Sequence, residues 1–567
     1  MCLRPLQHSE SLWTFRVYFR YMSLTVKPRP SVDGQHFHVV VIGGGINGVA
    51  VARECARAGK RTLLVEQNDF ASGVTSRSTR IIHGGLRYLE HGEIGLVRES
   101  VRERERLLGE RPHLVHPVHF LFLLNEQSER SALKVRAGLW LYQRFSGRKS
   151  GALSEMELKR VERALDAGHQ WSIFNYEDAQ CEFPERLVAE WMLEAAEAGA
   201  VVRNHCEVLA VDVAQGRARG VLLRDRITGK DARVDAGWIV NCSGPWADRI
   251  CQRSAVRTSK PMLGGVRGSH IVLPRFPGAP SVAVYTEAAD GRPIFVLPWN
   301  EQVLVGTTEV PDTGDPGRTA PSNEEIEYLF RSVAKLFPKA KIAAQDIKYA
   351  FAGVRPLPNS PGNKASAVTR RHFLHDHTAE GAGRLMSVIG GKLTTAASLA
   401  RECARKIGID VREPTMLALG PQGSLDPMLD QEALEIARAG AFSEETARGI
   451  LEWHGQRAMD IARMALVSAE LRAPVCPHSS HIVAEVVEAY RKEYAVTLAD
   501  VLLRRVPVAL GACWSESCSR EAALRIGAVL GWNEQDMGAN LEAFETERTA
   551  FMKKPARGSA ALEAAAD

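Results

Sequence analysis

Short apolar runs rich in β-branched residues alternate with amphipathic stretches in the first part of the chain. Residues 38–42 form the first run, and glycines followed by small and apolar residues at helical spacing continue to Ala58. Residues 61–66 form a second run that ends in an acidic residue. A continuous apolar run bounded by turn residues is typical of a strand buried in a parallel sheet. The pattern therefore predicts a βαβ unit and an α/β fold.

The middle of the chain continues this alternation. Two helices and two buried strands that end in glycine turns are expected over residues 93–108, 187–198, 238–244 and 385–391. Between residues 268 and 308, short strand-like runs follow one another closely, which predicts an antiparallel sheet in a second domain. A helix from Leu393 to Lys406 is expected directly after the last glycine turn.

The composition changes after Gly408, where prolines and glycines mark a linker, and residues 431–547 have a mostly helical pattern. We therefore expect an α/β (α+β overall) protein with a separate C-terminal helical domain. The expected parts are an N-terminal extension (1–33), a discontinuous Rossmann-like nucleotide-binding domain (34–130, 180–258 and 350–408), an antiparallel-sheet domain (131–179 and 259–349), the helical domain (409–548) and a tail (549–567).

The composition is that of an ordinary globular protein, with 567 residues, 45% of them hydrophobic and 25% charged. This length predicts two or three domains. The formal net charge of +5 is too weak over so long a chain to indicate a nucleic-acid partner. No apolar run approaches the roughly 20 residues that cross a bilayer. The basic N-terminal extension lacks the pattern of a secretory signal, which leaves a transit peptide, a disordered leader or a start at Met22 as alternatives.

The ten cysteines are scattered and none forms a C-x-x-C pair. Free thiols in a reducing compartment are therefore expected. No spacing typical of a zinc or iron–sulfur site is present, so no metal is expected.

A glycine motif occupies the turn between the first predicted strand and the helix. Gly43, Gly45 and Gly48 have the spacing G-x-G-x-x-G, and Glu66 ends the next predicted strand. The first glycine makes the tight turn, the second lets the backbone approach a pyrophosphate, and the third allows close helix–strand packing. An acid at position 66 accepts ribose hydroxyls and disfavours a 2′-phosphate. The motif predicts a dinucleotide site without deciding between NAD and FAD, and a ligand-free glycine turn is the alternative.

A set of further motifs carries a family resemblance. They are GVTSRSTRIIHGGLRYLE at 73–90, NCSGPW at 241–246, GSHIV at 268–272, GTT at 306–308, GVRPL at 353–357, TR at 369–370, GGKLTT at 390–395 and LADVLLRR at 498–505. In order and spacing they resemble the FAD-dependent (aerobic, quinone-linked) glycerol-3-phosphate dehydrogenases. The resemblance covers roughly residues 35 to 545.

The resemblance implies an FAD-binding domain of the glycine/D-amino-acid oxidase type and a substrate-binding sheet domain. It implies oxidation of sn-glycerol 3-phosphate to dihydroxyacetone phosphate by hydride transfer from C2 to FAD N5, with electrons passed to a membrane quinone. The residues that it assigns to the cofactor, beside the glycine motif and Glu66, are Thr75, Ser76, Ser78, Thr79, Gly244, Gly390, Gly391, Lys392 and Leu393.

A phosphate dianion calls for guanidinium donors, which bind it in a bidentate manner. Arg355 and Arg370 are the first expectations for this role, and Arg87 is the third. A solvated surface arginine is the alternative for each of them.

The alcohol proton calls for a general base within hydrogen-bond reach. His83 is expected to be the base and His270 to orient the hydroxyl, with the reverse assignment left open. Tyr88 is expected either to contact the substrate or to pack in the core. Lys392, at the start of the expected helix, places positive charge near the flavin, where reduction adds negative charge.

Residues 134–149 mix basic and aromatic side chains at helical spacing. They predict peripheral attachment to an anionic membrane surface, with Trp140, Tyr142 and Phe145 at the headgroup level. A helix that packs on the core is the alternative. With no EF-hand loop in the chain, the resemblance is to the bacterial form, which implies the cytoplasmic face of the inner membrane. The oligomeric state stays open, with a homodimer among the alternatives.

Three other functions remain compatible with the sequence. The first is a glycerol-3-phosphate oxidase that passes electrons to oxygen. The second is another FAD-dependent enzyme of the same superfamily that oxidises an amine or a hydroxy acid. The third is a dinucleotide-binding module with a structural or sensing role and no catalysis.

Overall fold

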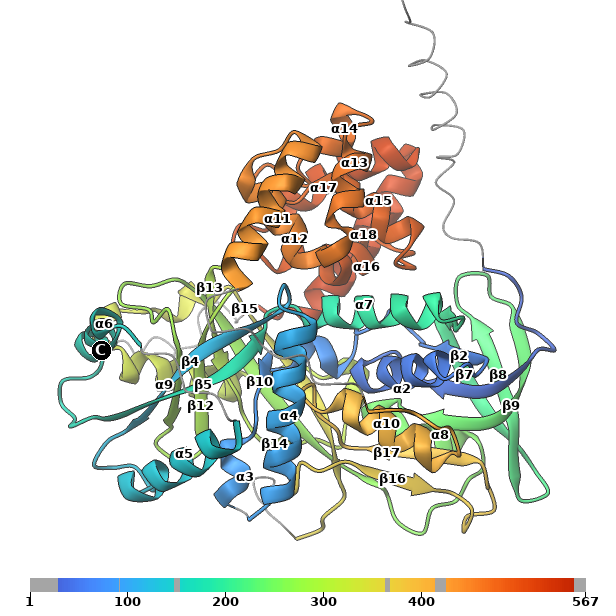
Figure 1. The fold of residues 1–567 in the computed structure, drawn as a ribbon, viewed down its shortest axis with the longest axis horizontal. Coiled ribbons are helices and arrows are strands. Elements are labelled where there is room, and N and C mark those ends of the chain that lie inside the picture. Colours follow the sequence, from blue (N-terminus) through green and yellow to red (C-terminus); the bar gives the residue numbers. More distant parts are fainter. Residues whose placement is uncertain (1–28, 91, 147–152, 363–367, 414–424, 555–567) are drawn as a thin grey trace, which may run out of the picture. The chain divides into compact units, whose positions relative to one another are not determined.

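The computed structural model describes residues 29–90, 92–146, 153–362, 368–413 and 425–554 (Figure 1). Among them, 31–413 and 548–554 belong to one compact unit, and 425–547 belong to a second unit with 29–30. The first unit contains two sheets and the second is helical. Of the linker expected after Gly408, residues 414–424 lie outside the described residues, and Pro427 lies in a helix that begins at Leu425.

The first sheet of the larger unit is built on the expected βαβ unit. Its strands run in the order β16-β17-β9-β1-β2-β6, with neighbouring strands parallel from β17 to β6 and β16 antiparallel at the edge. An antiparallel meander, β7-β8-β9, extends it. The strands are β1 (His36–Ile42), β2 (Thr62–Val65), β6 (Val201–Arg203), β7 (Cys206–Ala214), β8 (Arg217–Asp225), β9 (Asp231–Asn241), β16 (Phe373–Asp376) and β17 (Leu385–Ile389).

The second sheet is mostly antiparallel, as the pattern of residues 268–308 predicts. Its strands run in the order β14-β10-β13-β12-β11-β4-β5-β3, and β15 pairs with β10. The strands are β3 (Ile81–Ile82), β4 (Val115–Leu124), β5 (Ser172–Cys181), β10 (Leu263–Pro274), β11 (Ala283–Glu287), β12 (Pro293–Trp299), β13 (Gln302–Gly306), β14 (Val310–Pro311) and β15 (Tyr349–Pro358).

Each sheet buries apolar side chains in a core of its own. Helix α2 packs against α7 and α10, and α9 packs against β10 of the second sheet. The helices of the larger unit are α2 (Ile46–Arg57), α3 (Leu86–Glu90), α4 (Ile94–Glu110), α5 (Ala132–Ser146), α6 (Glu155–Ala164), α7 (Pro184–Glu197), α8 (Ala247–Arg253), α9 (Asn323–Leu336) and α10 (Ala396–Lys406). Three parts of the chain, residues 36–65, 201–241 and 373–389, supply the strands of the first sheet, and this α/β architecture confirms the predicted fold class.

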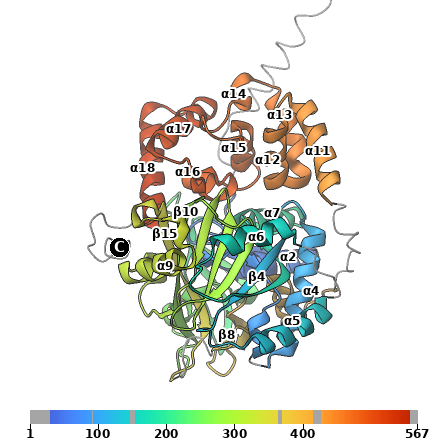
Figure 2. The ribbon, with the colours of Figure 1, turned by 90° about the vertical axis from the view of Figure 1, so that its left-hand side faces the viewer.

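The second unit is a bundle of short helices around an apolar core of its own (Figure 2). Its helices are α11 (Leu425–Gly440), α12 (Glu444–His454), α13 (Ala458–Ala465), α14 (Ala469–Arg472), α15 (Val483–Arg491), α16 (Leu498–Asp500), α17 (Glu516–Leu530) and α18 (Glu534–Phe551), the last of which belongs to this unit through Glu547. In the described part of the chain, no helix combines the length and the apolar character needed to cross a bilayer.

One helix begins later than its pattern predicts. The sequence places a helix start at Leu393, whereas α10 begins at Ala396 with Thr395 as its N-cap. Residues 393–395 form a turn instead. Lys392 therefore lies in an irregular segment and not in the first turn of a helix.

Candidate active site

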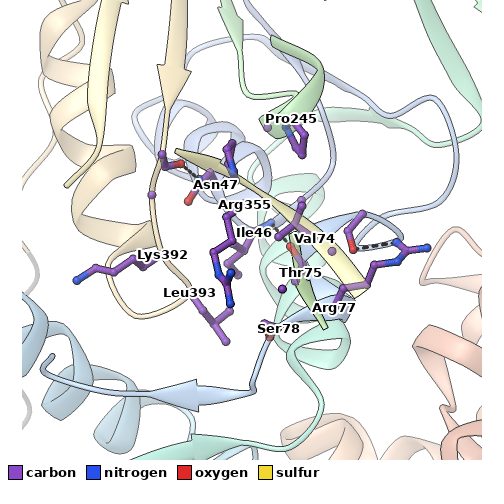
Figure 3. Close-up of a pocket in the computed structure, with 18 of the residues that line it drawn as sticks. Ile46, Asn47, Val74, Thr75, Arg77, Ser78, Pro245, Arg355, Lys392 and Leu393 are labelled. Carbon is purple, nitrogen blue, oxygen red and sulfur yellow. Dashed lines mark hydrogen bonds between the residues drawn. The ribbon is translucent and has the colours of Figure 1, made fainter. Parts of the chain in front are cut away.

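A cavity of about 680 Å³ opens where the carboxyl ends of the parallel strands meet one face of the second sheet (Figure 3). This is the usual ligand site of an open α/β sheet. Most of the residues that the sequence predicted for the site line this cavity: Gly43, Gly45, Glu66, Thr75, Ser78, Thr79, His83, Tyr88, Gly244, His270, Arg355, Arg370, Gly390, Gly391, Lys392 and Leu393.

The glycine motif forms the turn that the sequence predicts. Gly43 has a φ of +104°, and a Cβ there would stand 2.6 Å from the carbonyl oxygen of Cys242. Gly48 does not line the cavity; a Cβ there would collide with the backbone of Gly43. Gly48 thus serves helix–strand packing, and the bare backbone before α2 leaves the helix N-terminus open toward the cavity, a geometry that suits a pyrophosphate.

Glu66 follows the end of β2 and lines the same cavity. Its Oε2 accepts a hydrogen bond from the Gly44 amide at 2.7 Å, and its Oε1 accepts one from the Asn68 amide at 2.9 Å. Burial raises the pKa of Glu66, while the two amide donors oppose that rise. The two backbone bonds hold the carboxylate at the strand end, as a ribose acceptor requires.

The segment after Glu66 approaches the cavity through a short turn at Val74–Arg77. Thr75 Oγ1 accepts a hydrogen bond from the Ile46 amide at 3.1 Å, which ties the turn to the start of α2 (Figure 3). The Ser76 hydroxyl donates to the Ala71 carbonyl and does not line the cavity, so its expected contact with the cofactor stays a prediction. One hydroxyl of the Ser/Thr run thus stabilises the turn itself.

Asn47 is a cavity residue that the sequence analysis missed, although it lies inside the glycine motif. Its Nδ2 donates to the Gly390 carbonyl at 3.3 Å and so joins the first glycine turn to the last one. Its Oδ1 is buried and has no hydrogen-bond partner among the described residues. A buried acceptor in a lining residue calls for a ligand donor or a water. With the open helix end and Glu66, this atom fits a bound dinucleotide.

Two facing glycines expose bare backbone on the second sheet. Gly268 on β10 pairs with Gly353 on β15, and Cβ atoms there would stand 2.6 Å from Arg355 Cζ and 2.8 Å from Arg77 Cβ. Because side chains alternate along a strand, Gly268 and His270 share a face of β10, and Gly353 and Arg355 share a face of β15. The two glycines therefore leave room for the side chains of Arg355 and Arg77 next to the cavity.

Arg355 lies across this bare backbone. Its Nη2 donates to Thr307 Oγ1 at 2.8 Å and its Nη1 donates to the Thr308 carbonyl at 3.2 Å. Figure 3 shows the side chain between the turn of Thr75 and Ser78 and the segment that carries Leu393. The two hydrogen bonds orient the guanidinium before any substrate arrives, which lowers the entropic cost of binding an anion.

Arg370 lines the same cavity and is held by an acidic partner. Its Nη2 donates to Glu309 Oε1 at 2.7 Å, and both side chains are mostly buried. Glu309 follows the GTT motif directly, a position that the sequence analysis passed over. The third predicted arginine, Arg87, lies in α3, and its side chain is outside the described residues.

His270 is held deep beside the cavity, with 1% of its surface exposed. Its Nε2 lies 2.9 Å from Thr79 Oγ1, and its ring stacks on Phe351 at 4.9 Å between centroids. Burial lowers the pKa of His270 to about 3, and the charges of Arg355 and Arg80 lower it further. The imidazole is therefore neutral at pH 7.

His83 lies on a segment fixed on both sides. The His83 amide donates to Thr394 Oγ1 at 3.2 Å, and the Gly84 amide donates to Tyr142 Oη at 2.7 Å. Burial lowers the pKa of His83 to about 4, although the charge of Asp178 opposes that shift. His83 is thus also neutral at pH 7 and able to accept a proton.

Lys392 and Tyr88 contact each other at the cavity wall. The Lys392 ammonium stands over the Tyr88 ring at 4.4 Å and donates to Ser100 Oγ at 2.7 Å. Burial lowers the pKa of Lys392 to about 7, with Glu99 and Glu93 opposing the shift. At this wall the positive charge comes from the ammonium and not from a helix start, because α10 begins only at Ala396.

Helix α5 carries the surface that the sequence predicts for a membrane. Trp140 is 68% exposed and Leu133 is 77% exposed, and Lys134, Arg136 and Arg144 are exposed with them. Arg148 and Lys149, which complete the predicted basic set, lie outside the described residues.

The aromatic residues of α5 do not share one environment. The expectation for Tyr142 is wrong, because it is buried and its hydroxyl donates to Asp178 Oδ1 at 2.6 Å. Phe145 is half-buried, with Arg98 4.9 Å from its ring centroid. Helix α5 thus packs one face on the core and presents the other to solvent, and its attachment to a membrane stays a prediction.

Two protein families match the chain. The family described as FAD dependent oxidoreductase matches residues 38–397, and the family described as C-terminal domain of alpha-glycerophosphate oxidase matches residues 386–537.

Curated relatives extend this likeness over most of the chain. A glycerol-3-phosphate dehydrogenase of Synechocystis sp. is 36% identical over 501 residues, which are 85% of this chain and 90% of the relative. An aerobic glycerol-3-phosphate dehydrogenase of Staphylococcus saprophyticus is 30% identical over 94% of this chain and 97% of its own length. A D-erythritol 1-phosphate dehydrogenase of Brucella abortus is 39% identical over 64% of this chain and 71% of its own length.

A solved structure shares the fold. The glycerol-3-phosphate dehydrogenase of Bacillus halodurans, crystallised with FAD, superposes with a TM-score of 0.72 at 23% identity. The superposition covers 93% of this chain and 97% of that one.

Proposed function

Because the chain belongs to the family of FAD-dependent glycerol-3-phosphate dehydrogenases and oxidases, we propose that it oxidises sn-glycerol 3-phosphate to dihydroxyacetone phosphate. In this proposal a hydride leaves C2 for FAD N5 and the electrons then pass to a membrane quinone. The observation that carries the proposal is one cavity lined by a dinucleotide cradle, by Arg355 and Arg370 among other arginines, and by two neutral histidines.

The cofactor is assigned to the cradle formed by the glycine motif, Glu66 and Asn47. Bound FAD supplies the acceptor for a hydride. Glu66 would accept hydrogen bonds from the ribose hydroxyls, and the start of α2 would face the pyrophosphate. Asn47 Oδ1 offers a further acceptor inside the cavity.

Arg355 and Arg370 are assigned to the substrate phosphate. The hydrogen bonds of Arg355 to Thr307 and Thr308 and the ion pair of Arg370 with Glu309 support this role, because they fix both guanidinium groups at the cavity wall. Guanidinium groups bind phosphate oxygens in a bidentate manner. A substrate without a phosphate forfeits both contacts.

His83 is assigned the role of the general base that accepts the alcohol proton of the substrate. As the C2–H bond breaks, the O–H proton moves to an imidazole nitrogen of His83, which is neutral before the step. His270 is more deeply buried, has the lower pKa and is engaged with Thr79, which suits it to orienting the hydroxyl. A bound phosphate dianion raises the pKa of both rings and so strengthens them as bases.

Lys392 is assigned the role of stabilising the negative charge that develops next to the substrate during reduction. Its pKa of about 7 leaves the side chain partly protonated at neutral pH. An ammonium in a buried site stabilises a neighbouring negative charge more than one in water does. Tyr88, under the ammonium, holds this side chain and is assigned a positioning role.

The exposed face of α5 is assigned to a membrane surface, where the quinone resides. Trp140 and Leu133 supply apolar area, and the basic residues beside them supply attraction to anionic lipids. This would place the protein on the cytoplasmic face of the inner membrane as a peripheral protein. Flotation with anionic vesicles tests the assignment: wild type should bind, and a Trp140→Ser, Leu133→Ser variant should not. Equal binding of both would remove α5 from the interface.

An anaerobic titration of the purified yellow protein with glycerol 3-phosphate tests the reaction itself. The proposal expects loss of the oxidised flavin absorbance in proportion to added substrate, and formation of dihydroxyacetone phosphate. Colourless protein, or flavin that the substrate does not bleach, would reject it in favour of a binding module. Bleaching by amino acids or hydroxy acids but not by glycerol 3-phosphate would point to another enzyme of the superfamily.

Two further measurements separate the closest alternatives. Reoxidation by a short-chain quinone without peroxide supports the dehydrogenase, whereas stoichiometric peroxide without quinone supports an oxidase. The likeness to a D-erythritol 1-phosphate dehydrogenase makes a four-carbon polyol phosphate the second candidate substrate. The ratio of kcat/KM for the two phosphates decides between them.

A further inference from the structure

Three groups that bind soft metal ions meet in the helical unit, away from every residue assigned above. They are Cys476 and His478, in the segment between α14 and α15, and Cys518, in the first turn of α17. Their ligand atoms all lie within 4.8 Å of one another. Cys476 and Cys518 are almost fully buried, and His478 is exposed. Figure 2 shows the three helices in this unit.

The spacing of the cluster matches tetrahedral coordination. With Zn–S bonds of about 2.3 Å and Zn–N bonds of about 2.0 Å, tetrahedral geometry separates a sulfur and a nitrogen ligand by roughly 3.6 Å. Cys518 Sγ lies 3.8 Å from His478 Nδ1. This pair of ligand atoms is thus already at about the separation that a shared ion would impose.

Both sulfurs are also supplied with hydrogen-bond donors. The backbone amide of His478 donates to the sulfur of Cys476, and the Ser515 hydroxyl donates to Cys518 Sγ at 3.4 Å. Donors of this kind stabilise thiolates and orient metal ligands.

Cys513 is a fourth candidate ligand: it is exposed, and its sulfur is not one of the three ligand atoms that lie within 4.8 Å of one another, so its side chain would have to turn toward the ion. It precedes Cys518 by five residues, and its carbonyl accepts a hydrogen bond from Cys518 Sγ at 3.5 Å. Three cysteines and one histidine form one of the common ligand sets of structural zinc sites. The pairs Cys476–His478 and Cys513–Cys518 come from two segments about 40 residues apart, so a shared ion would cross-link them.

We propose that the helical unit holds a structural Zn²⁺ ion bound by Cys476, His478 and Cys518, with Cys513 as the fourth ligand. Binding converts the three thiols to thiolates and releases three protons, while His478 binds as the neutral imidazole through Nδ1. No electron is transferred. The ion ties the segment before α15 to the start of α17 and stabilises the helical unit.

Metal analysis of the full-length, FAD-loaded protein purified without chelator tests the proposal. About one zinc per chain is expected, and reconstitution with Co²⁺ should produce the thiolate charge-transfer and d–d absorption of a tetrahedral site. Removing the metal with a chelator should lower the temperature of thermal unfolding and increase the number of thiols that react with a disulfide reagent. A wild-type protein that binds neither ion, or that contains a disulfide between Cys476 and Cys518, would overturn the proposal.

Single variants assign the ligands. Cys476→Ser and Cys518→Ser should lose the zinc, and Cys513→Ser should release it at a lower chelator concentration than wild type. Cys403→Ala removes a buried thiol of the other unit and should keep the full zinc content. His375→Gln alters a second cluster, His375, His377 and Glu380, and should also keep it. Zinc that survives in Cys476→Ser or disappears in His375→Gln would place the ion elsewhere and reject the site.

Discussion

The guanidinium group of Arg355 lies against the backbone of Gly268, in the space that a side chain at that position would fill. A Cβ at Gly268 would stand 2.6 Å from Arg355 Cζ, and atoms do not approach that closely without displacement. The arginine also bonds to Thr307 and Thr308. The position of the proposed phosphate ligand therefore depends on a glycine on the neighbouring strand.

Gly268→Ala should displace Arg355 and raise the KM for glycerol 3-phosphate about tenfold, which corresponds to about 1.4 kcal/mol. FAD content should stay the same, because Gly268 belongs to the second sheet. Gly95→Ala is the matched control, since a Cβ there meets no atom within 4 Å. Steady-state kinetics that give wild-type KM values for Gly268→Ala would show that Arg355 does not contact the phosphate.

Arg370→Met should also weaken binding of glycerol 3-phosphate, since it removes a guanidinium group and leaves the Glu309 carboxylate beside the phosphate. We expect KM to rise at least tenfold for the phosphate ester and to change little for glycerol. Arg371→Met removes an exposed arginine next in sequence and should resemble wild type. Equal losses with both substrates would argue against a phosphate contact.

His83→Asn should slow anaerobic flavin reduction by a factor of about 10² to 10⁴, the range of general-base catalysis. His270→Asn should raise KM more than it lowers the reduction rate, because its assigned role is orientation. Stopped-flow absorbance separates the two effects. A larger loss of rate in His270→Asn than in His83→Asn would exchange the two roles.

Glu66→Ala should weaken retention of FAD during dialysis, because the proposed ribose acceptor and the bonds to the Gly44 and Asn68 amides are lost together. Asp235→Ala removes an exposed acid from β9 of the same sheet and is the control. Flavin content per chain measures the difference. A Glu66→Ala protein that keeps FAD as firmly as Asp235→Ala would reject the ribose assignment.

We expect the stability of the helical unit to depend on pH in the acid range because of Glu485. It lies between His454 Nε2 at 3.0 Å and His481 Nδ1 at 2.9 Å, and these two histidines lower its pKa from 4.5 to about 2 against the cost of burial. A depressed carboxyl pKa stabilises the fold above pH 4.5, and this contribution is lost as pH falls through about 2.

Denaturant midpoints of wild type and Glu485→Gln across the acid range check this. The advantage of wild type should be largest above pH 4.5 and should shrink toward pH 2. An advantage that does not change with pH would mean that the carboxylate contributes through packing and not through its charge.

The motifs of the nucleotide site were accessible from the sequence because each acts over a short stretch of chain. Gly43 is required by a single turn, and Glu66 is held by amides of the same βαβ unit. Hydrophobic runs and glycines report such local geometry directly. The same pattern was less reliable at helix ends, since α10 starts at Ala396 and leaves Lys392 in an irregular segment.

Contacts between distant segments were decided only by the tertiary structure. The Tyr142 hydroxyl donates to Asp178 on β5, and the Arg370 guanidinium donates to Glu309. In the helical unit, His478 Nδ1 lies 3.8 Å from the sulfur of Cys518, which is 40 positions away in the sequence. The order of residues along a chain specifies turns and strand faces, whereas the closing of long loops by packing specifies which side chains share a site.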